Sequence, residues 1–110
     1  MAILLSIDDI NFMFKVHSSY YSEIPFCFEE TGEGLFTLVK SYVDLSSPFQ
    51  SRTRCDGSLM MHTHPNNYYG FSEGDYSYLE DNSNRWAFIG IVTSDKLLVS
   101  DINRDYWVLS

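Results

Sequence analysis

The stretch SLMMHTHPNNYYGFSEGD, residues 58–75, decides how this chain folds. Its first part is a short apolar run that ends at a proline, which predicts a strand over 58–64 followed by a polar loop. Ser72 with Asp75 three residues later is typical of a reciprocal capping box, which predicts a helix over 73–81. A strand, a loop and a capped helix are therefore expected to follow one another here.

The segments on either side continue as a mixture of helix and strand. Ser6 with Asp9 resembles a second capping box, and apolar residues then recur from Ile10 to Tyr21 at helical spacing. Runs rich in β-branched and aromatic residues alternate with turn residues further along, which is typical of strands. The expected elements are a helix over 7–21, hairpin strands over 24–28 and 35–43 with a turn at 31–34, a loop over 46–57, and strands over 86–92, 97–102 and 106–109. This order predicts an α+β sheet domain.

Length and composition limit the number of domains. The chain has 110 residues, which suits one hydrophobic core and is too short for two, so a single domain is expected over 1–110. Hydrophobic residues make up 45% of the chain and aromatic residues 16%. This apolar content is ample for a folded domain and argues against a disordered chain.

The charge balance excludes several classes of partner. Fifteen acidic against seven basic residues give a net charge of −8, and the basic residues are scattered along the chain. A surface that follows phosphates needs clustered positive charge, so neither nucleic acid nor an anionic membrane is an expected partner. No apolar run approaches the roughly 20 residues of a membrane span, and the N-terminus lacks the basic flank of a signal peptide. A soluble cytoplasmic chain is therefore expected.

The chain has two cysteines, Cys27 and Cys55. They could form at most one bridge, and neither has a second cysteine at the spacing of a metal site. We expect both to be reduced thiols, with export to an oxidising compartment as the alternative.

Two histidines and one carboxylate are candidates for a metal site. His62 and His64 are two residues apart on the expected strand, so both imidazoles project from the same face. Asp75, in the first turn of the following helix, could supply a third ligand once the loop folds back. Three protein ligands with a vacant fourth position are typical of a catalytic zinc site. The alternative is a histidine pair without a metal, with Ser72 and Asp75 serving only as a helix cap.

The conjunction of these residues favours the metal site. The run His62-Thr63-His64-Pro65, a spacer of six residues, and then Ser72-Glu73-Gly74-Asp75 resembles a known signature. It is the His-Ser/Thr-His-Pro, spacer, Ser-x-x-Asp signature of the JAMM metalloproteases, also called the JAB or MPN-domain family. The resemblance implies a mixed sheet flanked by helices, related in shape to the cytidine deaminases. The short chain looks like a minimal bacterial or phage member.

The resemblance also implies roles for individual residues. His62, His64 and Asp75 would bind zinc, and Ser72 would help to stabilise the oxyanion of the intermediate. Asp75 could serve both the metal and the helix cap, with one carboxylate oxygen on each. His17 lies on the first helix and is not expected to be a ligand, because a fourth protein ligand would close the site.

The general base is the least specific assignment. The family places a glutamate where the first helix gives way to a strand, followed three residues later by glycine and then by a hydrophobic residue. Glu23 fits that location, although Phe26 stands where glycine is expected. The rivals are Glu29, Glu30 and Glu33, which lie in or beside the expected turn. Tyr68, Tyr69 and Phe71 lie near the proposed metal, and they either line a substrate groove or pack on the sheet.

The function implied is zinc-dependent hydrolysis of a peptide or isopeptide bond. In the family the leaving amine is often a lysine joined to ubiquitin or to a ubiquitin-like tail, so the expected partner is a protein or peptide. One alternative is a non-catalytic, metal-binding MPN-like interaction module. Another is a toxin-associated effector domain, delivered from its source cell, with an unknown substrate. A zinc deaminase is disfavoured, because its His-x-Glu motif would need glutamate where His64 stands.

Overall fold

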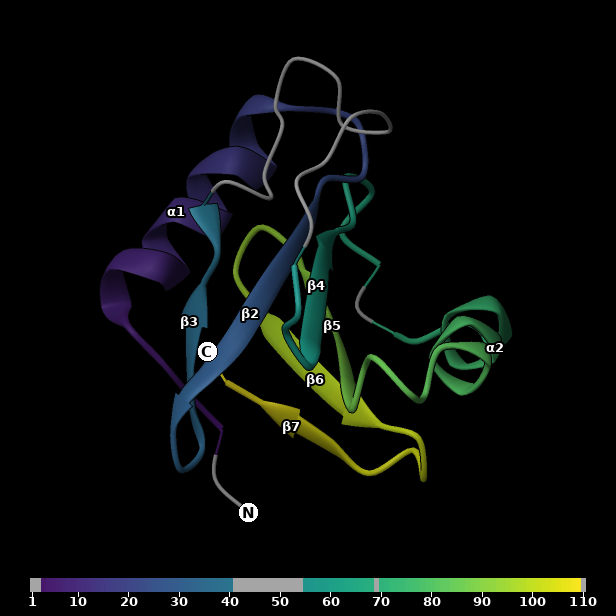
Figure 1. Ribbon diagram of the computed structural model, residues 1–110. Coiled ribbons are helices and arrows are strands. Elements are labelled where there is room, and N and C mark those ends of the chain that lie inside the picture. The colour runs from purple at the N-terminus through teal and green to yellow at the C-terminus, as the bar shows by residue number, and fades with distance from the viewer. Residues whose placement is uncertain (1–2, 41–54, 69, 110) are drawn as a thin grey trace.

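The computed structural model describes residues 3–40, 55–68 and 70–109. In this part of the chain a seven-stranded mixed sheet is accompanied by two helices (Figure 1). The elements are β1 (Leu4–Leu5), α1 (Ile7–Ser19), β2 (Pro25–Gly32), β3 (Leu35–Leu38), β4 (Leu59–Thr63), α2 (Glu73–Asp81), β5 (Phe88–Val92), β6 (Leu97–Asp101) and β7 (Tyr106–Val108).

The strand order places β4 near the centre of the sheet. The order is β1-β3-β2-β4-β5-β6-β7, with β4 antiparallel to β2 and parallel to β5. Pro25 pairs with His62 at the start of β2, so the segment that enters β2 lies beside the end of β4. The expected α+β class and the mixed, helix-flanked sheet are confirmed.

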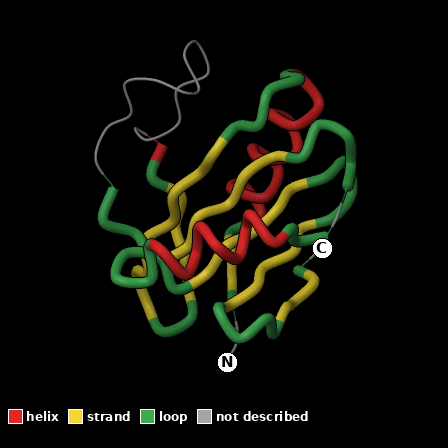
Figure 2. Tube along the Cα trace, turned by 90° about the vertical axis from the view of Figure 1, so that its right-hand side faces the viewer, coloured by secondary structure: helices red, strands yellow, loops and turns green. Residues whose placement is uncertain are grey.

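The two helices pack on opposite faces of the sheet (Figure 2). Met13 of α1 packs with Phe26 and Met61, while Leu79 of α2 packs in a second cluster with Met60 at its border. Met60 and Met61 are neighbours on one strand and so point to opposite faces. By the same alternation His62 and His64 face the α2 side, and Thr63 faces the α1 side.

Helix α1 begins with half of the expected capping box. The Ser6 hydroxyl accepts a hydrogen bond from the Asp9 amide at 3.1 Å, as a cap should. The Asp9 carboxylate, however, is buried and accepts from the amide of Leu38 at 3.1 Å, so it ties the helix to β3. The helix ends at Ser19, and Tyr21 lies beyond it with 97% of its surface exposed. The expected extension of the helix to Tyr21 is wrong.

Cys27 and Cys55 form a disulfide, so the expectation of reduced thiols is wrong. The segment that leads into β4 lies against β2, where the Ser58 amide donates to the Phe28 carbonyl at 3.2 Å. Gly57 permits this close approach, because a Cβ there would lie 2.2 Å from the Phe28 oxygen. The disulfide lies in the buried cluster beneath α2. The cysteines are 28 residues apart, and the strand pairing brings them together.

Most element boundaries agree with the sequence-based expectations to within a few residues. Helix α2 spans Glu73–Asp81, as its cap predicted. The short strand β1 was not expected, and it pairs in parallel with β3. The expected strand residues 41–43 and most of the expected loop, 46–54, lie outside the described residues. Among the described residues, neither helix has the length and apolar character needed to cross a membrane.

Candidate metal centre

The centre of the site is the pair His62 and His64 at the end of β4. Both residues are 8% exposed, and their Nε2 atoms lie 2.8 Å apart. This convergence follows from the alternation of side chains along the strand, which places both rings on the α2 face. Two ring nitrogens therefore point to one place, as ligands of a single metal ion would.

A backbone carbonyl orients the ring of His64. Its Nδ1 lies 2.5 Å from the carbonyl oxygen of Tyr68, which can only accept. The proton is therefore on Nδ1, which leaves the lone pair of Nε2 directed at His62. The loop reaches this position because Asn67 adopts a left-handed φ of 61° and its amide donates to the carbonyl of His64 at 2.9 Å. A histidine that donates through one nitrogen and presents the other is typical of metal ligands.

The pKa of His62 is lowered to about 4, mainly because burial disfavours the charged ring. The neighbouring His64 lowers the pKa further, and Asp75 partly offsets both effects. His62 is therefore neutral at pH 7, which is the form that binds metals. Its Nδ1 is buried and has no hydrogen-bond partner among the described residues. Burying a polar group without a partner costs about 1–3 kcal/mol, so an apolar residue at this position would make the fold more stable.

Asp75 approaches the pair from the first turn of α2. Its Oδ2 accepts from the Ser72 amide at 2.9 Å, and its own amide donates to the Ser72 hydroxyl at 3.0 Å. These two bonds form the capping box expected from the sequence. The other oxygen, Oδ1, lies 3.7 Å from Nε2 of His62. The carboxylate thus serves the helix with one oxygen and faces the histidine pair with the other.

Glu23 approaches the pair from the segment that joins α1 to β2. Its Oε1 lies 3.7 Å from Nε2 of His64, and 58% of its side chain is exposed. Thr63 holds this segment from both sides of Glu23: its hydroxyl accepts from the Ile24 amide at 2.8 Å and donates to the Ser22 carbonyl at 3.2 Å. The Thr63 amide also donates to the Ile24 carbonyl at 3.0 Å. The residue between the two histidines therefore fixes the backbone that carries the glutamate.

The three rival glutamates lie far from the histidine pair. Glu29 pairs with Thr37 along the hairpin, and the Glu30 carboxylate accepts from the Gly34 amide in the turn. His62 is opposite Pro25 at the other end of β2, and each strand residue adds about 3.3 Å. Phe26, which stands where the family has glycine, is fully buried and packs edge-to-face on Phe12 of α1.

His17 contacts the site only through the backbone, since its Nε2 donates to the carbonyl oxygen of His64 at 3.0 Å. The two aromatic residues that the structure describes near the site differ in position. Tyr68 stacks on the His64 ring, with the ring centroids 6.3 Å apart, and Phe71 packs on Tyr76. Tyr69 lies outside the described residues.

A cleft of about 350 Å³ opens beside the histidine pair, and its lining includes Glu23, His64, Tyr68, Ser72 and Asp75. The ligand atoms of Glu23, His62 and His64 lie within 4.8 Å of one another, so Glu23 competes with Asp75 as the oxygen ligand. A tetrahedral zinc with nitrogen ligands at 2.0–2.1 Å separates them by about 3.3 Å. The histidine pair would therefore open by about half an ångström around the ion, a shift within the reach of two side chains.

Sequence reasoning missed two contributors to this geometry. Thr63 appears in the motif, and its position could have been inferred from the sequence. Side chains alternate along a strand, so a threonine between two histidines that share one face must point to the other face of the sheet. The carbonyl of Tyr68 has no side-chain signal, since any residue at that position would supply it.

The fold is similar to that of a solved zinc-site protein. That structure is described as JAMM, a metalloprotease-like zinc site in the proteasome and signalosome, and it matches with a TM-score of 0.64. The match covers 97% of this chain and 94% of the other at 12% sequence identity. The similarity shows a shared fold. No protein-family model and no curated protein matches the sequence.

Proposed function

We propose that this chain is a zinc-dependent peptidase or isopeptidase and a minimal member of the JAMM family. The observation that carries the proposal is the convergence of two buried imidazoles with two carboxylates beside one open cleft. A closed structural site would use four protein ligands, usually with cysteine among them, whereas both cysteines here are in the disulfide.

The metal would be held by His62, His64 and Asp75. When bound, zinc supplies a water of pKa near 7 and polarises a carbonyl group. Asp75 is preferred to Glu23 as the third ligand because the helix cap fixes its position and its side chain is 19% exposed, against 58% for Glu23.

Glu23 would act as the general base. Its carboxylate accepts a proton from the attacking water and returns it to the leaving amine, which requires a group that can approach both. An exposed side chain on a fixed backbone meets this need. The Ser72 hydroxyl accepts from the Asp75 amide and keeps its own proton for donation to the developing oxyanion. The substrate we propose is therefore a protein or peptide amide, with a ubiquitin-like tail as one candidate.

Metal analysis of the purified chain tests this proposal. We expect about one zinc per chain, which a chelator removes. Peptide cleavage should be lost when the zinc is removed and should return when zinc is added back. A chain that binds no zinc under any condition would overturn the proposal.

A non-catalytic, metal-binding module is the second candidate. It is favoured by one observation: Ser72 and Asp75 have a structural role in the cap whether or not they act in catalysis. Stoichiometric zinc without cleavage of any peptide in a diverse library would favour this module over the hydrolase.

A further inference from the structure

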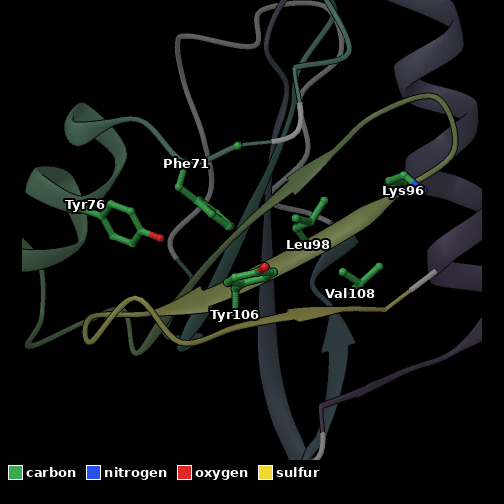
Figure 3. Close-up of a pocket in the computed structure, with 7 residues that line it drawn as sticks. Phe71, Tyr76, Lys96, Leu98, Tyr106 and Val108 are labelled. Carbon is green, nitrogen blue, oxygen red and sulfur yellow. The ribbon is translucent and has the colours of Figure 1, made fainter.

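An apolar groove lies on the sheet face beside α2 (Figure 3). Apart from Gly70, its lining residues differ from those of the metal cleft. Its floor consists of Leu98 of β6 and Val108 of β7, which pair across the two strands. Tyr106, Phe71 and Tyr76 form its walls. Tyr106 and Val108 are 63% and 59% exposed, so the groove is accessible from solvent.

The groove and the metal cleft share one lining residue and meet at the start of α2. Gly70 lines both spaces, and the residues that follow divide between them: Phe71 and Tyr76 face the groove, and Ser72 and Asp75 face the cleft. The segment at the start of α2 is therefore a shared wall.

The walls of the groove are held in place by polar contacts. The Tyr76 hydroxyl lies 3.2 Å from the Ser100 hydroxyl, and the Arg104 guanidinium lies 4.4 Å from the Tyr76 ring centroid. Arg104 also makes two 2.8 Å hydrogen bonds to the carboxylate of Glu73 at the start of α2. Strand β6, the turn that follows it and helix α2 thus fix the groove, which reduces the ordering needed for binding.

We propose that this groove is a specificity subsite that receives a bulky apolar side chain of the substrate, close to the scissile amide. The inference rests on the proposed hydrolase function and adds a substrate class to it. The groove has a volume of about 380 Å³, at the lower end of the roughly 300–1,000 Å³ of ligand pockets. That space suits one or two side chains such as leucine or phenylalanine. It is too small for a folded partner.

Binding can be tested without catalysis. Acetyl-Leu-Gly-Gly-amide and acetyl-Asn-Gly-Gly-amide have the same charge and nearly the same size, and they differ in the polarity of one side chain. We expect the leucine peptide to shift the backbone amide resonances of Phe71, Leu98 and Val108 saturably, with an affinity at least about tenfold above that of the asparagine peptide. Equal affinities, or shifts elsewhere on the chain, would overturn the subsite.

A matched pair of variants locates the binding. Val108→Trp fills the groove from β7, and Leu4→Trp places the same side chain on β1, at the opposite edge of the sheet. Val108 and Leu4 are 59% and 56% exposed, so both variants should fold, which circular dichroism checks. We expect Val108→Trp to lower the affinity for the leucine peptide at least about tenfold, and Leu4→Trp to leave that affinity unchanged. Unchanged binding by Val108→Trp would overturn the assignment.

Cleavage of a pooled library of blocked peptides by the zinc-loaded chain gives the second measurement. We expect cut sites to carry leucine, phenylalanine or a similar residue at one fixed position, and Val108→Trp to lose this preference while retaining its zinc. Cleavage without such a preference would overturn the subsite and leave the hydrolase intact. Saturable binding in the groove without any cleavage would support the groove as a peptide site and overturn the hydrolase.

Discussion

The two carboxylates beside the histidine pair are held in different ways. Asp75 is fixed through its own side chain, because one of its oxygens closes the cap of α2. Glu23 is fixed through its backbone, because Thr63 bonds to the residues on either side of it and leaves the carboxylate exposed. Both carboxylates lie 3.7 Å from a histidine nitrogen, so distance alone does not separate them.

The difference in attachment matches a difference in task. A metal ligand must stay in one place, whereas a general base must approach the water first and the leaving amine afterwards. A carboxylate locked into a helix cap suits the first task, and a free carboxylate on a fixed backbone suits the second. Each variant below replaces one of these carboxylates or another group of the site, or removes a hydroxyl that bonds to the backbone beside one of them.

Asp75→Asn should have the largest effect. The amide oxygen can still accept from Ser72, so the cap and the stability should survive, but the anionic ligand is lost. We expect metal analysis to find less than a tenth of the wild-type zinc, as for His62→Ala and His64→Ala, because each removes one of three ligands. Full zinc in Asp75→Asn, together with its loss in Glu23→Gln, would transfer the ligand role to Glu23.

Glu23→Gln should retain both zinc and fold and lose hydrolysis. The amide is nearly isosteric but cannot accept the proton, and general bases typically contribute about 10²–10⁴-fold. Peptide cleavage and zinc content are measured on the same samples. Glu29→Gln is the matched control, since that residue lies along the hairpin and should leave the rate unchanged. Equal rates for the two variants would remove Glu23 from the mechanism.

Ser72→Ala should lower the rate about 10²-fold or more while the zinc stays bound, as the loss of an oxyanion donor does. It should also lower the free energy of unfolding by about 1 kcal/mol, because the α2 cap is lost. Ser6→Ala separates the two effects, since Ser6 caps α1 in the same way at a different place in the fold. If the Ser72→Ala and Ser6→Ala variants cleave peptide at the same rate, Ser72 has a role only in capping the helix.

Thr63→Val should have the smallest effect on the rate. The side chain keeps its shape but loses both hydrogen bonds, so Glu23 is less well placed and we expect kcat to fall about tenfold with KM unchanged. The two backbone groups left without a partner should also cost about 1–3 kcal/mol. Thr63→Ser should restore the rate because it restores the hydroxyl. A Thr63→Val protein with wild-type kcat would show that the exposed glutamate needs no such support.

The parts of this molecule that could be predicted from the sequence are those set by local chemistry. Helix α2 begins where Ser72 and Asp75 cap it, and β4 presents His62 and His64 on one face because side chains alternate. The Cys27–Cys55 bond and the burial of Asp9 against β3 could not be predicted, because each joins segments that meet only through strand pairing. The contact with the Tyr68 carbonyl could not be predicted either, because every residue type has the same backbone carbonyl.

The double use of Asp75 also bears on how such a site would decay during evolution. A descendant that lost its catalytic activity would still be under selection to keep Ser72 and Asp75, because the helix depends on them. His62 would have no such protection, since its Nδ1 is buried without a partner and an apolar residue would be more stable there. Among relatives of this chain, the presence of His62 would therefore indicate a working site, whereas the presence of Ser72 and Asp75 would indicate only the fold.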